Sequence, residues 1–373
     1  MRKKIIYIDE DARYGGPQHR MILVAKNLKK FFDITFLISN DGNKIFKKKL
    51  KENKLYFKEI KITRLTKDFN TLLNYIVFFI PELVSLLIYL NKVKPDIVQV
   101  NSTPHFKALI AASILKIPTI WVLEDSNLPL IIKLIFKILN KIFRPNLLVT
   151  SNIVRDYYLN KKKFSNNLRK IYAPVSLKVF NPQKYKIKKF NIKKIDILMI
   201  ANLTKIKGIE VFLKIVEIAP KNFYFTLCGG YTQNQKKYAK TLMLKFKKFN
   251  QKKLNYIGHQ DNISNIISKC DFLICTSLSE AGPMTSMEGI CMKKPLITNK
   301  VGIVNDLFKN YKKFMVVENN NPTKFINNIK KLSLVPKLRK KIIKKSHEIA
   351  VKEFSLEKIS KQYQNYYNFI IKN

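Results

Sequence analysis

The sequence contains few of the residues that build metal sites or disulfide frameworks. Its 373 residues include only four cysteines and four histidines. No two cysteines have the C-x-x-C spacing of zinc and redox motifs, and no histidine lies at metal-ligand spacing from a cysteine. These features predict no metal and no bound cofactor. They also predict buried, reduced thiols, as in a cytoplasmic protein.

Glycine and proline are also scarce. Ten glycines and 14 prolines exclude a collagen-like or low-complexity chain. The hydrophobic fraction of 46% is sufficient for two cores, and 373 residues are long for one ordinary domain. We therefore expect a soluble, folded protein of two domains.

Acidic residues are few, and so are arginines. The chain has 71 basic and 25 acidic residues, a net charge of +46, but only eight of the basic residues are Arg. Recognition of base edges and bidentate phosphate contacts favour Arg over Lys. The composition therefore indicates a lysine-rich surface attracted to polyanions and anionic membranes, without specific nucleic-acid recognition. A basic nucleic-acid-binding protein remains an alternative, which salt-dependent binding of a scrambled oligonucleotide would test.

No uninterrupted apolar run is a clear membrane span. Residues 71–90 come nearest, but Pro81 and Glu82 stand at their centre, which favours a buried or interfacial helix. Near the start of the chain, the apolar stretch within residues 3–8 is short and is followed by Asp9. We therefore recognise no signal peptide there.

The chain does contain a regular alternation of short apolar runs with longer segments of helical period. The strand candidates are residues 4–8, 34–38, 96–100, 119–123, 147–150, 195–201, 224–228, 254–257, 272–275, 296–298 and 314–317. Continuous apolar strands separated by helices predict βαβ units and buried parallel sheets. Two such sets predict two Rossmann-like lobes, residues 1–180 and 181–353, with a boundary in the polar segment 181–194. Because ligands bind beyond the carboxyl ends of parallel strands, we expect the site in a cleft between the lobes.

An acidic motif follows the strand candidate 272–275. Glu280 and Glu288 stand eight residues apart and flank Gly282, Pro283 and the expected start of a helix. A helix N-terminus offers unpaired N–H groups to a diphosphate, and a carboxylate accepts two hydroxyls of a sugar or ribose. An ordinary surface loop acid and an ordinary helix acid are the alternative interpretation.

The pattern Glu280-x7-Glu288, followed by Lys-Pro-Leu-Ile-Thr and Val-Gly, resembles the retaining GT-B glycosyltransferases of family 4. The resemblance extends over essentially the whole chain and is strongest over residues 195–306. It implies an α/β GT-B fold in which an acceptor-binding and a donor-binding Rossmann-like lobe face a central cleft. It also implies that a C-terminal helix within residues 354–373 crosses back to the N-terminal lobe. Retention of anomeric configuration and the absence of a metal cluster are further implications.

The resemblance assigns roles to the acidic motif. Glu288 would hold the nucleotide ribose, and Glu280 would contact the donor sugar. The loop amides around Gly282, Pro283 and Met284 would remain available to the donor. The family usually has an aromatic residue where this chain has Gly282, so we expect different local packing there.

On the phosphate side, Lys207 matches the lysine of the family's Lys-Gly pair. An ammonium at that position would neutralise the leaving diphosphate. The family commonly has an arginine five residues earlier, where this chain has Asn202, and Lys205 offers a compensating charge. Solvated surface lysines are the alternative in a chain so rich in Lys.

Glycine loops complete the predicted donor site. Gly15 and Gly16 resemble the family's Gly-Gly loop, where paired glycines permit a close approach of the backbone to a ligand. Gly229 follows another strand near the expected nucleotide, and Gly258-His259 resembles the segment that contacts the base. A plain turn and a surface histidine are the alternatives.

The strand candidates 96–100 and 119–123 end in polar residues. Glu124 stands where many members of the family have His. Glu124, Lys207 and Glu280 are our three candidate catalytic residues. Glu124 is the one placed to bind or deprotonate an acceptor hydroxyl. A polar residue that merely ends a strand is the alternative.

Residues 128–143 form a basic amphipathic pattern. Lys133, Lys137 and Lys141 recur at helical spacing, and most of the other residues are Ile and Leu. A helix lying on an anionic membrane and a core helix with a solvated lysine stripe explain this pattern equally well.

Together these features predict a retaining glycosyltransferase that moves a sugar from a nucleotide diphosphate-sugar to a hydroxyl of a glycan or lipid-linked acceptor. The predicted setting is cell-surface polysaccharide or lipopolysaccharide biosynthesis, in the cytoplasm, with peripheral contact at the inner face of the plasma membrane. The nucleotide-sugar is a co-substrate and not a cofactor. A sugar-nucleotide epimerase of the same fold and a non-catalytic relative remain alternatives.

Overall fold

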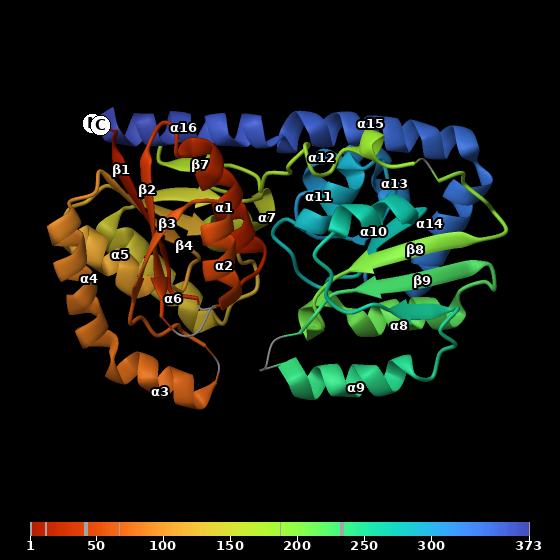
Figure 1. The fold of residues 1–373 in the computed structure, drawn as a ribbon, viewed down its shortest axis with the longest axis horizontal. Coiled ribbons are helices and arrows are strands. Elements are labelled where there is room, and N and C mark those ends of the chain that lie inside the picture. The colour runs from red at the N-terminus through yellow and green to blue at the C-terminus, as the bar shows by residue number, and fades with distance from the viewer. Residues whose placement is uncertain are drawn as a thin grey trace. The chain divides into compact units, whose positions relative to one another are not determined.

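The computed structural model describes residues 2–11, 13–40, 44–66, 68–186, 188–231 and 235–372. Within these residues the chain forms two compact units, each built on its own sheet with covering helices (Figure 1). Unit 1 comprises Met1–Pro174 together with Leu356–Asn373. Unit 2 comprises Val175–Ser355.

Unit 1 is built on a parallel sheet. Its strands are β1 (Lys4–Asp9), β2 (Asp33–Ser39), β3 (Tyr56–Ile60), β4 (Ile97–Asn101), β5 (Thr119–Leu123), β6 (Asn146–Val149) and β7 (Leu168–Lys170). They lie in the order β3-β2-β1-β4-β5-β6-β7. The helices of the unit are α1 (Gly16–Leu28), α2 (Lys44–Glu52), α3 (Phe69–Val77), α4 (Phe79–Val93), α5 (Phe106–Ile114), α6 (Leu130–Phe143), α7 (Asn152–Leu159) and α16 (Leu356–Lys372). Every residue of β4 and β5 is buried, as expected for apolar strands covered on both faces.

Unit 2 repeats this architecture. Its strands are β8 (Ile195–Ile200), β9 (Phe223–Cys228), β10 (Leu254–Tyr256), β11 (Phe272–Cys275), β12 (Leu296–Asn299) and β13 (Val316–Val317). They form a parallel sheet in the order β10-β9-β8-β11-β12-β13. The helices are α8 (Ile209–Ile218), α9 (Lys236–Phe246), α10 (Ile263–Lys269), α11 (Met284–Cys291), α12 (Val304–Leu307), α13 (Lys312–Met315), α14 (Pro322–Leu334) and α15 (Pro336–Phe354). The strand order reverses between β8 and β11, which is where ligands of such sheets bind.

Helix α16 returns to unit 1 after the chain has completed unit 2, as the resemblance implied. It packs on α1 and buries a row of tyrosines. The hydroxyl of Tyr367 lies 2.6 Å from that of Tyr7 and donates to Gln99 (2.6 Å), while Tyr366 donates to the carbonyl of Leu147 (3.2 Å). The helix therefore completes the core of unit 1.

The predicted strands all correspond to observed ones, but two edge strands were missed. β3 has the sequence YFKEI with no buried residue, and β7 is only three residues long, so neither forms an apolar run. Part of the strand candidate 314–317 is wrong, because Lys312–Met315 is helix α13 and only Val316–Val317 is strand. Val316 and Val317 are β-branched, which favours strand, whereas Phe314 and Met315 before them are not.

Residues 71–90, for which the sequence favoured one buried or interfacial helix, are divided between α3 and α4, and the chain bends by 57° between these helices. Pro81 explains the break, since its ring clashes with the carbonyl of the residue four positions earlier, Val77, where α3 ends. Across the described ranges, no single helix has the length and hydropathy of a membrane span. The bent pair α3 and α4 meets that requirement only when taken together.

Candidate functional site

The loops that follow β8 and β11 hold most of the predicted donor residues. Residues 201–208 and 276–283 are tied together at the carboxyl edge of the unit 2 sheet. Thr276 Oγ1 donates to the carbonyl of Gly208 (2.9 Å), and the amide of Leu278 donates to a carbonyl of the other loop (2.8 Å). The two loops therefore form one structural element.

Gly208 permits this close crossing. Its φ of +63° lies in the left-handed region, and a Cβ built there would stand 2.0 Å from the Thr276 carbonyl oxygen. Only glycine fits that position without a shift of the backbone. Gly208 thereby directs the chain into α8 and leaves Lys207 beside Glu280.

Lys207 and Glu280 form an ion pair through Nζ and Oε1. The hydroxyl of Ser277 donates to the same carboxylate oxygen (3.1 Å). Burial acts to lower the pKa of Lys207, but the Glu280 carboxylate outweighs it and raises this pKa above its ordinary value. The ammonium is therefore charged, and a diphosphate brought to this loop would compete with Glu280 for it.

Glu288 lies on α11 with its side chain almost wholly buried, 6% exposed. Gly289 allows this, because a Cβ there would stand 1.7 Å from Leu273 Cδ1, so α11 packs directly on β11. No hydrogen bond or ion pair reaches the Glu288 carboxyl from any residue that the structure describes. Burial alone raises the pKa of Glu288 to about 8. A ligand with two hydroxyl donors would satisfy this carboxyl.

Glycines also shape the ends of β9 and β10. Gly229 has a φ of +156°, and a Cβ there would stand 1.9 Å from the Ala201 carbonyl oxygen. Its amide donates to the carbonyl of Gly258 (2.8 Å). Gly258 has a φ of +66° and faces open space, and the exposed ring of His259 follows it, with Nε2 3.8 Å from Asp261 Oδ1. A planar ligand group can therefore approach this turn closely.

The remaining donor predictions in unit 2 lie on the same loops. Asn202 and Lys205 are exposed after β8. Gly282 and Met284 are half-buried at the start of α11, and Pro283 is its buried N-cap. All donor residues predicted in the second half of the chain therefore lie along one edge of one sheet.

Asn299, at the end of β12, was not singled out from the sequence. Its Nδ2 donates to the carbonyls of Thr276 (2.8 Å) and Ser277 (3.0 Å). Its Oδ1 is buried and has no hydrogen-bond partner within the described ranges. Asn299 thus braces the loop that carries Glu280. The sequence did contain a signal for Asn299, because this polar residue ends β12, the strand that pairs with β11 before the acidic motif.

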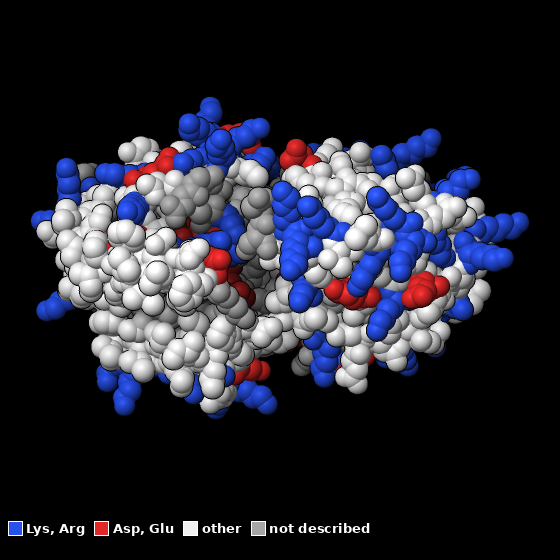
Figure 2. All heavy atoms as spheres, turned by 90° about the horizontal axis from the view of Figure 1, so that it is seen from below, with Lys and Arg blue, Asp and Glu red and all other residues white. Residues whose placement is uncertain are grey.

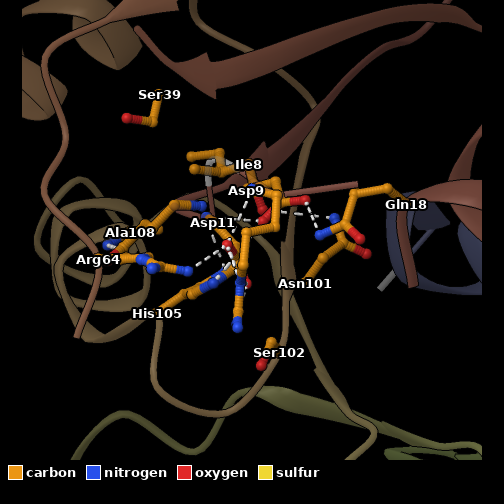
Figure 3. A network of polar contacts seen from close by, with 12 residues as sticks. Ile8, Asp9, Asp11, Gln18, Ser39, Arg64, Asn101, Ser102, His105 and Ala108 are labelled. Atoms are coloured by element: carbon orange, nitrogen blue, oxygen red, sulfur yellow. Dashed lines mark hydrogen bonds and ion pairs between the residues drawn. The ribbon is translucent and has the colours of Figure 1, made fainter. Parts of the chain in front are cut away.

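Gly15 and Gly16 lie in unit 1, at the carboxyl edge of its sheet. Gly15 is the N-cap of α1, and its amide donates to Gln18 Oε1 (3.0 Å). Gln18 Nε2 in turn donates to Asp9 Oδ2 (2.8 Å) at the end of β1, as Figure 3 shows. The paired glycines are thereby fastened to the sheet.

Figure 3 also shows that Asp9 and Asp11 meet side chains from other loops. His105 Nε2 lies 3.7 Å from Asp9 Oδ1, and Arg64 Nη1 donates to Asp11 Oδ1 (3.1 Å). Burial lowers the pKa of His105 to about 4 and raises the pKa of Asp9 well above its usual range. Burial also acts on Asp11, but the Arg13 guanidinium outweighs it and lowers the pKa of that carboxyl. At this edge burial therefore disfavours the charged forms of Asp9 and His105, whereas arginine favours the charged form of Asp11.

Glu124, the third catalytic candidate, lies in a buried ion pair. Its Oε1 is 2.6 Å from Nη2 of Arg20 on α1. Arg20 also donates to the hydroxyl of Tyr363 on α16 (3.2 Å). Burial raises the pKa of Glu124, and Arg20 only partly offsets that. The contact links α1, α16 and the end of β5, and the catalytic role of Glu124 stays a prediction.

The four cysteines are free and buried. Among the residues that the structure describes, no group of three or more His, Cys, Asp or Glu side chains is placed to hold a metal ion.

The candidate donor residues of unit 2 lie within a region that matches a known domain. Residues 181–348 match the family model described as glycosyl transferases group 1. One curated relative is the O-antigen biosynthesis glycosyltransferase WclY of Escherichia coli, 27% identical over 183 residues, which are 48% of this chain and 49% of that protein. The chain therefore spans about half the length of this relative.

Solved structures match the whole chain. HepE from Anabaena, in complex with UDP and glucose, has a TM-score of 0.81 at 15% identity and covers 98% of this chain and 99% of its own. A glycosyltransferase from Rickettsia africae has a TM-score of 0.79 at 21% identity and covers 100% and 99%. The predicted GT-B fold is confirmed, and the resemblance is supported at the level of the group 1 domain.

Proposed function

We propose that this chain is a glycosyltransferase that binds a nucleotide diphosphate-sugar at the carboxyl edge of the unit 2 sheet. The observation that carries the proposal is Glu288, a residue 6% exposed whose carboxyl no described residue hydrogen-bonds, in the same matched domain as the Lys207–Glu280 pair. A ribose diol supplies two donors to such a carboxyl, and a diphosphate supplies the anion that Lys207 attracts. HepE, whose fold is similar, was crystallised with UDP and glucose.

In this proposal Lys207 acts on the leaving group. As the bond between the sugar and the diphosphate breaks, negative charge gathers on the phosphate oxygens, and a fixed ammonium stabilises it. Glu280 holds that ammonium in place before the donor binds and accepts sugar hydroxyls once the diphosphate has taken its place. The Gly258 turn receives the base.

We assign the reaction to the retaining class of family 4. The acceptor is a hydroxyl of a glycan or a lipid-linked glycan, and the setting is polysaccharide or lipopolysaccharide synthesis at the inner face of the plasma membrane. The O-antigen biosynthesis role given in the name of WclY supports the choice of acceptor class. Retention would be tested by the anomeric proton couplings of the product.

Donor binding is tested by thermal unfolding with UDP-, GDP- and ADP-sugars. At a concentration about 100 times Kd, a ligand that binds only the folded state adds about 2.7 kcal/mol. For a unit of this size that raises Tm by about 5 to 11 °C. Glu288→Ala and Lys207→Met should lose most of this response. Glu217→Ala and Lys214→Met, at exposed positions of α8, should keep it.

Failure of every nucleotide-sugar to raise Tm would contradict the proposal. An equal response from wild type and Glu288→Ala would contradict the ribose assignment. Incubation of the bound donor without acceptor separates transfer from epimerisation, because only an epimerase would convert the sugar under those conditions.

A further inference from the structure

Helices α3, α4 and α6 expose an unusual number of large apolar side chains. On α3 and α4 these include Phe69, Ile76, Ile80 and Ile88, and on α6 they include Leu130, Ile131, Ile138 and Ile142. Each of these side chains is between 57% and 75% exposed. Apolar surface on this scale is rare on a soluble monomer unless it binds something.

Core packing alone does not account for α6. Only Ile132 and Phe136 of its 14 residues are buried. Ile132 and Phe136 pack α6 on the core of unit 1, as the interpretation as a core helix requires. That interpretation does not account for the other Ile and Leu side chains of the helix, most of which face outward. The same holds for α3, where only Tyr75 is buried.

The three helices belong to one face of the unit 1 sheet. They lie in the connections from β3 to β4 and from β5 to β6, which run in the same direction across the sheet. Right-handed crossovers place such helices on a common face. Figure 2 views the molecule from the α3 side of Figure 1 and shows a broad area of unit 1 with few charged side chains, bordered by Lys and Arg and in places by Asp and Glu.

The charges within these helices are almost all positive. Helix α3 has none, and α6 has only Lys133, Lys137 and Lys141. The single acid of the three helices is Glu82 on α4, which is buried and bonded to Lys107 (2.5 Å). Within the three helices the apolar surface carries lysines and no exposed acid, and the exposed Asp68 caps the start of α3. This composition fits the headgroups of anionic lipids.

We propose that this surface docks on an anionic lipid bilayer, with α3, α4 and α6 lying in the plane of the interface. A second copy of the chain is the weaker candidate, since each copy carries a net charge of +46. The inference extends beyond the sugar transfer proposed above and does not depend on it. It places the apolar contact on three helices. The sequence had suggested membrane contact for residues 128–143 and a buried or interfacial helix for residues 71–90.

The apolar contribution is tested by flotation with vesicles of phosphatidylcholine, with and without phosphatidylglycerol. Wild type should float with the anionic vesicles. Replacing exposed residues by Ser in two triple variants, one on α3 and α4 and one on α6, should each lower the partition coefficient more than tenfold. The substitutions are Ile76→Ser, Ile80→Ser and Ile88→Ser in the first variant, and Ile131→Ser, Ile138→Ser and Ile142→Ser in the second. The matched control changes equally exposed residues of unit 2, Ile218→Ser, Leu244→Ser and Leu334→Ser, and should float like wild type.

A second comparison separates this surface from the overall charge. Lys137→Gln with Lys141→Gln should weaken binding by about fivefold per lysine. Lys240→Gln with Lys247→Gln removes the same charge from exposed positions of α9 and around its end, and should have little effect. Equal losses from both pairs would overturn the proposal in favour of nonspecific attraction.

Depth is measured with an environment-sensitive fluorophore on a single introduced cysteine. The four native cysteines are buried, so labelling is directed to the new thiol. A probe at Ile138→Cys or Ile80→Cys should shift to the blue on anionic vesicles, whereas a probe at Leu244→Cys should not. No shift at either surface position would refute insertion. A stable dimer abolished by the Ser variants would assign the surface to a second copy instead.

Discussion

The buried carboxyl of Glu288 predicts that the protein without ligand loses stability as the pH rises through neutrality. Burial raises the pKa of this group to about 8, whereas an unfolded chain releases the proton near its ordinary value of 4.5. Between these two values the folded state holds a proton that the unfolded state has lost. Protons bound to the folded state then exceed those bound to the unfolded state, so the free energy of unfolding falls as the pH increases.

The magnitude follows from the two pKa values. Each pH unit within the interval costs about 1.4 kcal/mol, so stability falls by about 3 kcal/mol between about pH 5 and pH 7. Glu288→Gln keeps the size of the side chain but cannot ionise. Relative to wild type, its free energy of unfolding should therefore rise by that amount over the same interval.

Urea unfolding of wild type and Glu288→Gln at a series of pH values measures this directly. Subtracting the free energy of unfolding of one protein from that of the other cancels the contribution of other groups that titrate in the same range. One such group is Glu10, because burial raises its pKa to about 7. Glu217→Gln, at an exposed position, provides the matched control. A difference between wild type and Glu288→Gln that stays constant from about pH 5 to pH 8 would refute the reasoning.

Three further predictions concern the donor loop of unit 2, the buried ion pair of unit 1 and the core beneath α16. Gly208→Ala places a Cβ against the Thr276 carbonyl and should destabilise the protein by about 2 kcal/mol or more, measured by urea unfolding; a neutral result would contradict the close crossing. Arg20→Met leaves the Glu124 carboxylate buried without its partner and should cost about 3–5 kcal/mol; adding Glu124→Leu should recover much of that loss. Tyr367→Phe removes two buried hydrogen bonds and should cost about 1–3 kcal/mol, with unchanged donor binding as its check.

The strands could be predicted because they leave a strong local signal. A fully covered parallel strand must be apolar along its whole length, and TIWVL at 119–123 coincides with β5. Strand β3 has no such requirement at the sheet edge, and its polar residues concealed it. The bend between α3 and α4 could also be predicted from the sequence. Pro81 prevents the helix from continuing through the residue four positions earlier, Val77, where α3 ends.

The positions of the site residues could be predicted better than their surroundings. The motif placed Glu280 and Glu288 after β11, but the partner of Glu280 comes from a loop 73 residues earlier in the chain. Glu124 was chosen as a candidate to bind or deprotonate an acceptor hydroxyl. Its partner Arg20 could not be foreseen, because Arg20 is 104 residues away and becomes its neighbour only when α1 packs on the sheet. Exposure is equally nonlocal, as α6 shows. Ile132 and Phe136 pack on the core, but most of the other Ile and Leu side chains of α6 are exposed, which the sequence did not decide.

The return of α16 to unit 1 sets an order for folding during synthesis. All strands of unit 1 leave the ribosome before unit 2 does, yet the tyrosines of α16, which pack on α1 and on the sheet, arrive only afterwards. Unit 2 is continuous in sequence and can complete its core first. The first half of the nascent chain must therefore wait with an unfinished interior, and chaperones would be needed most in that period.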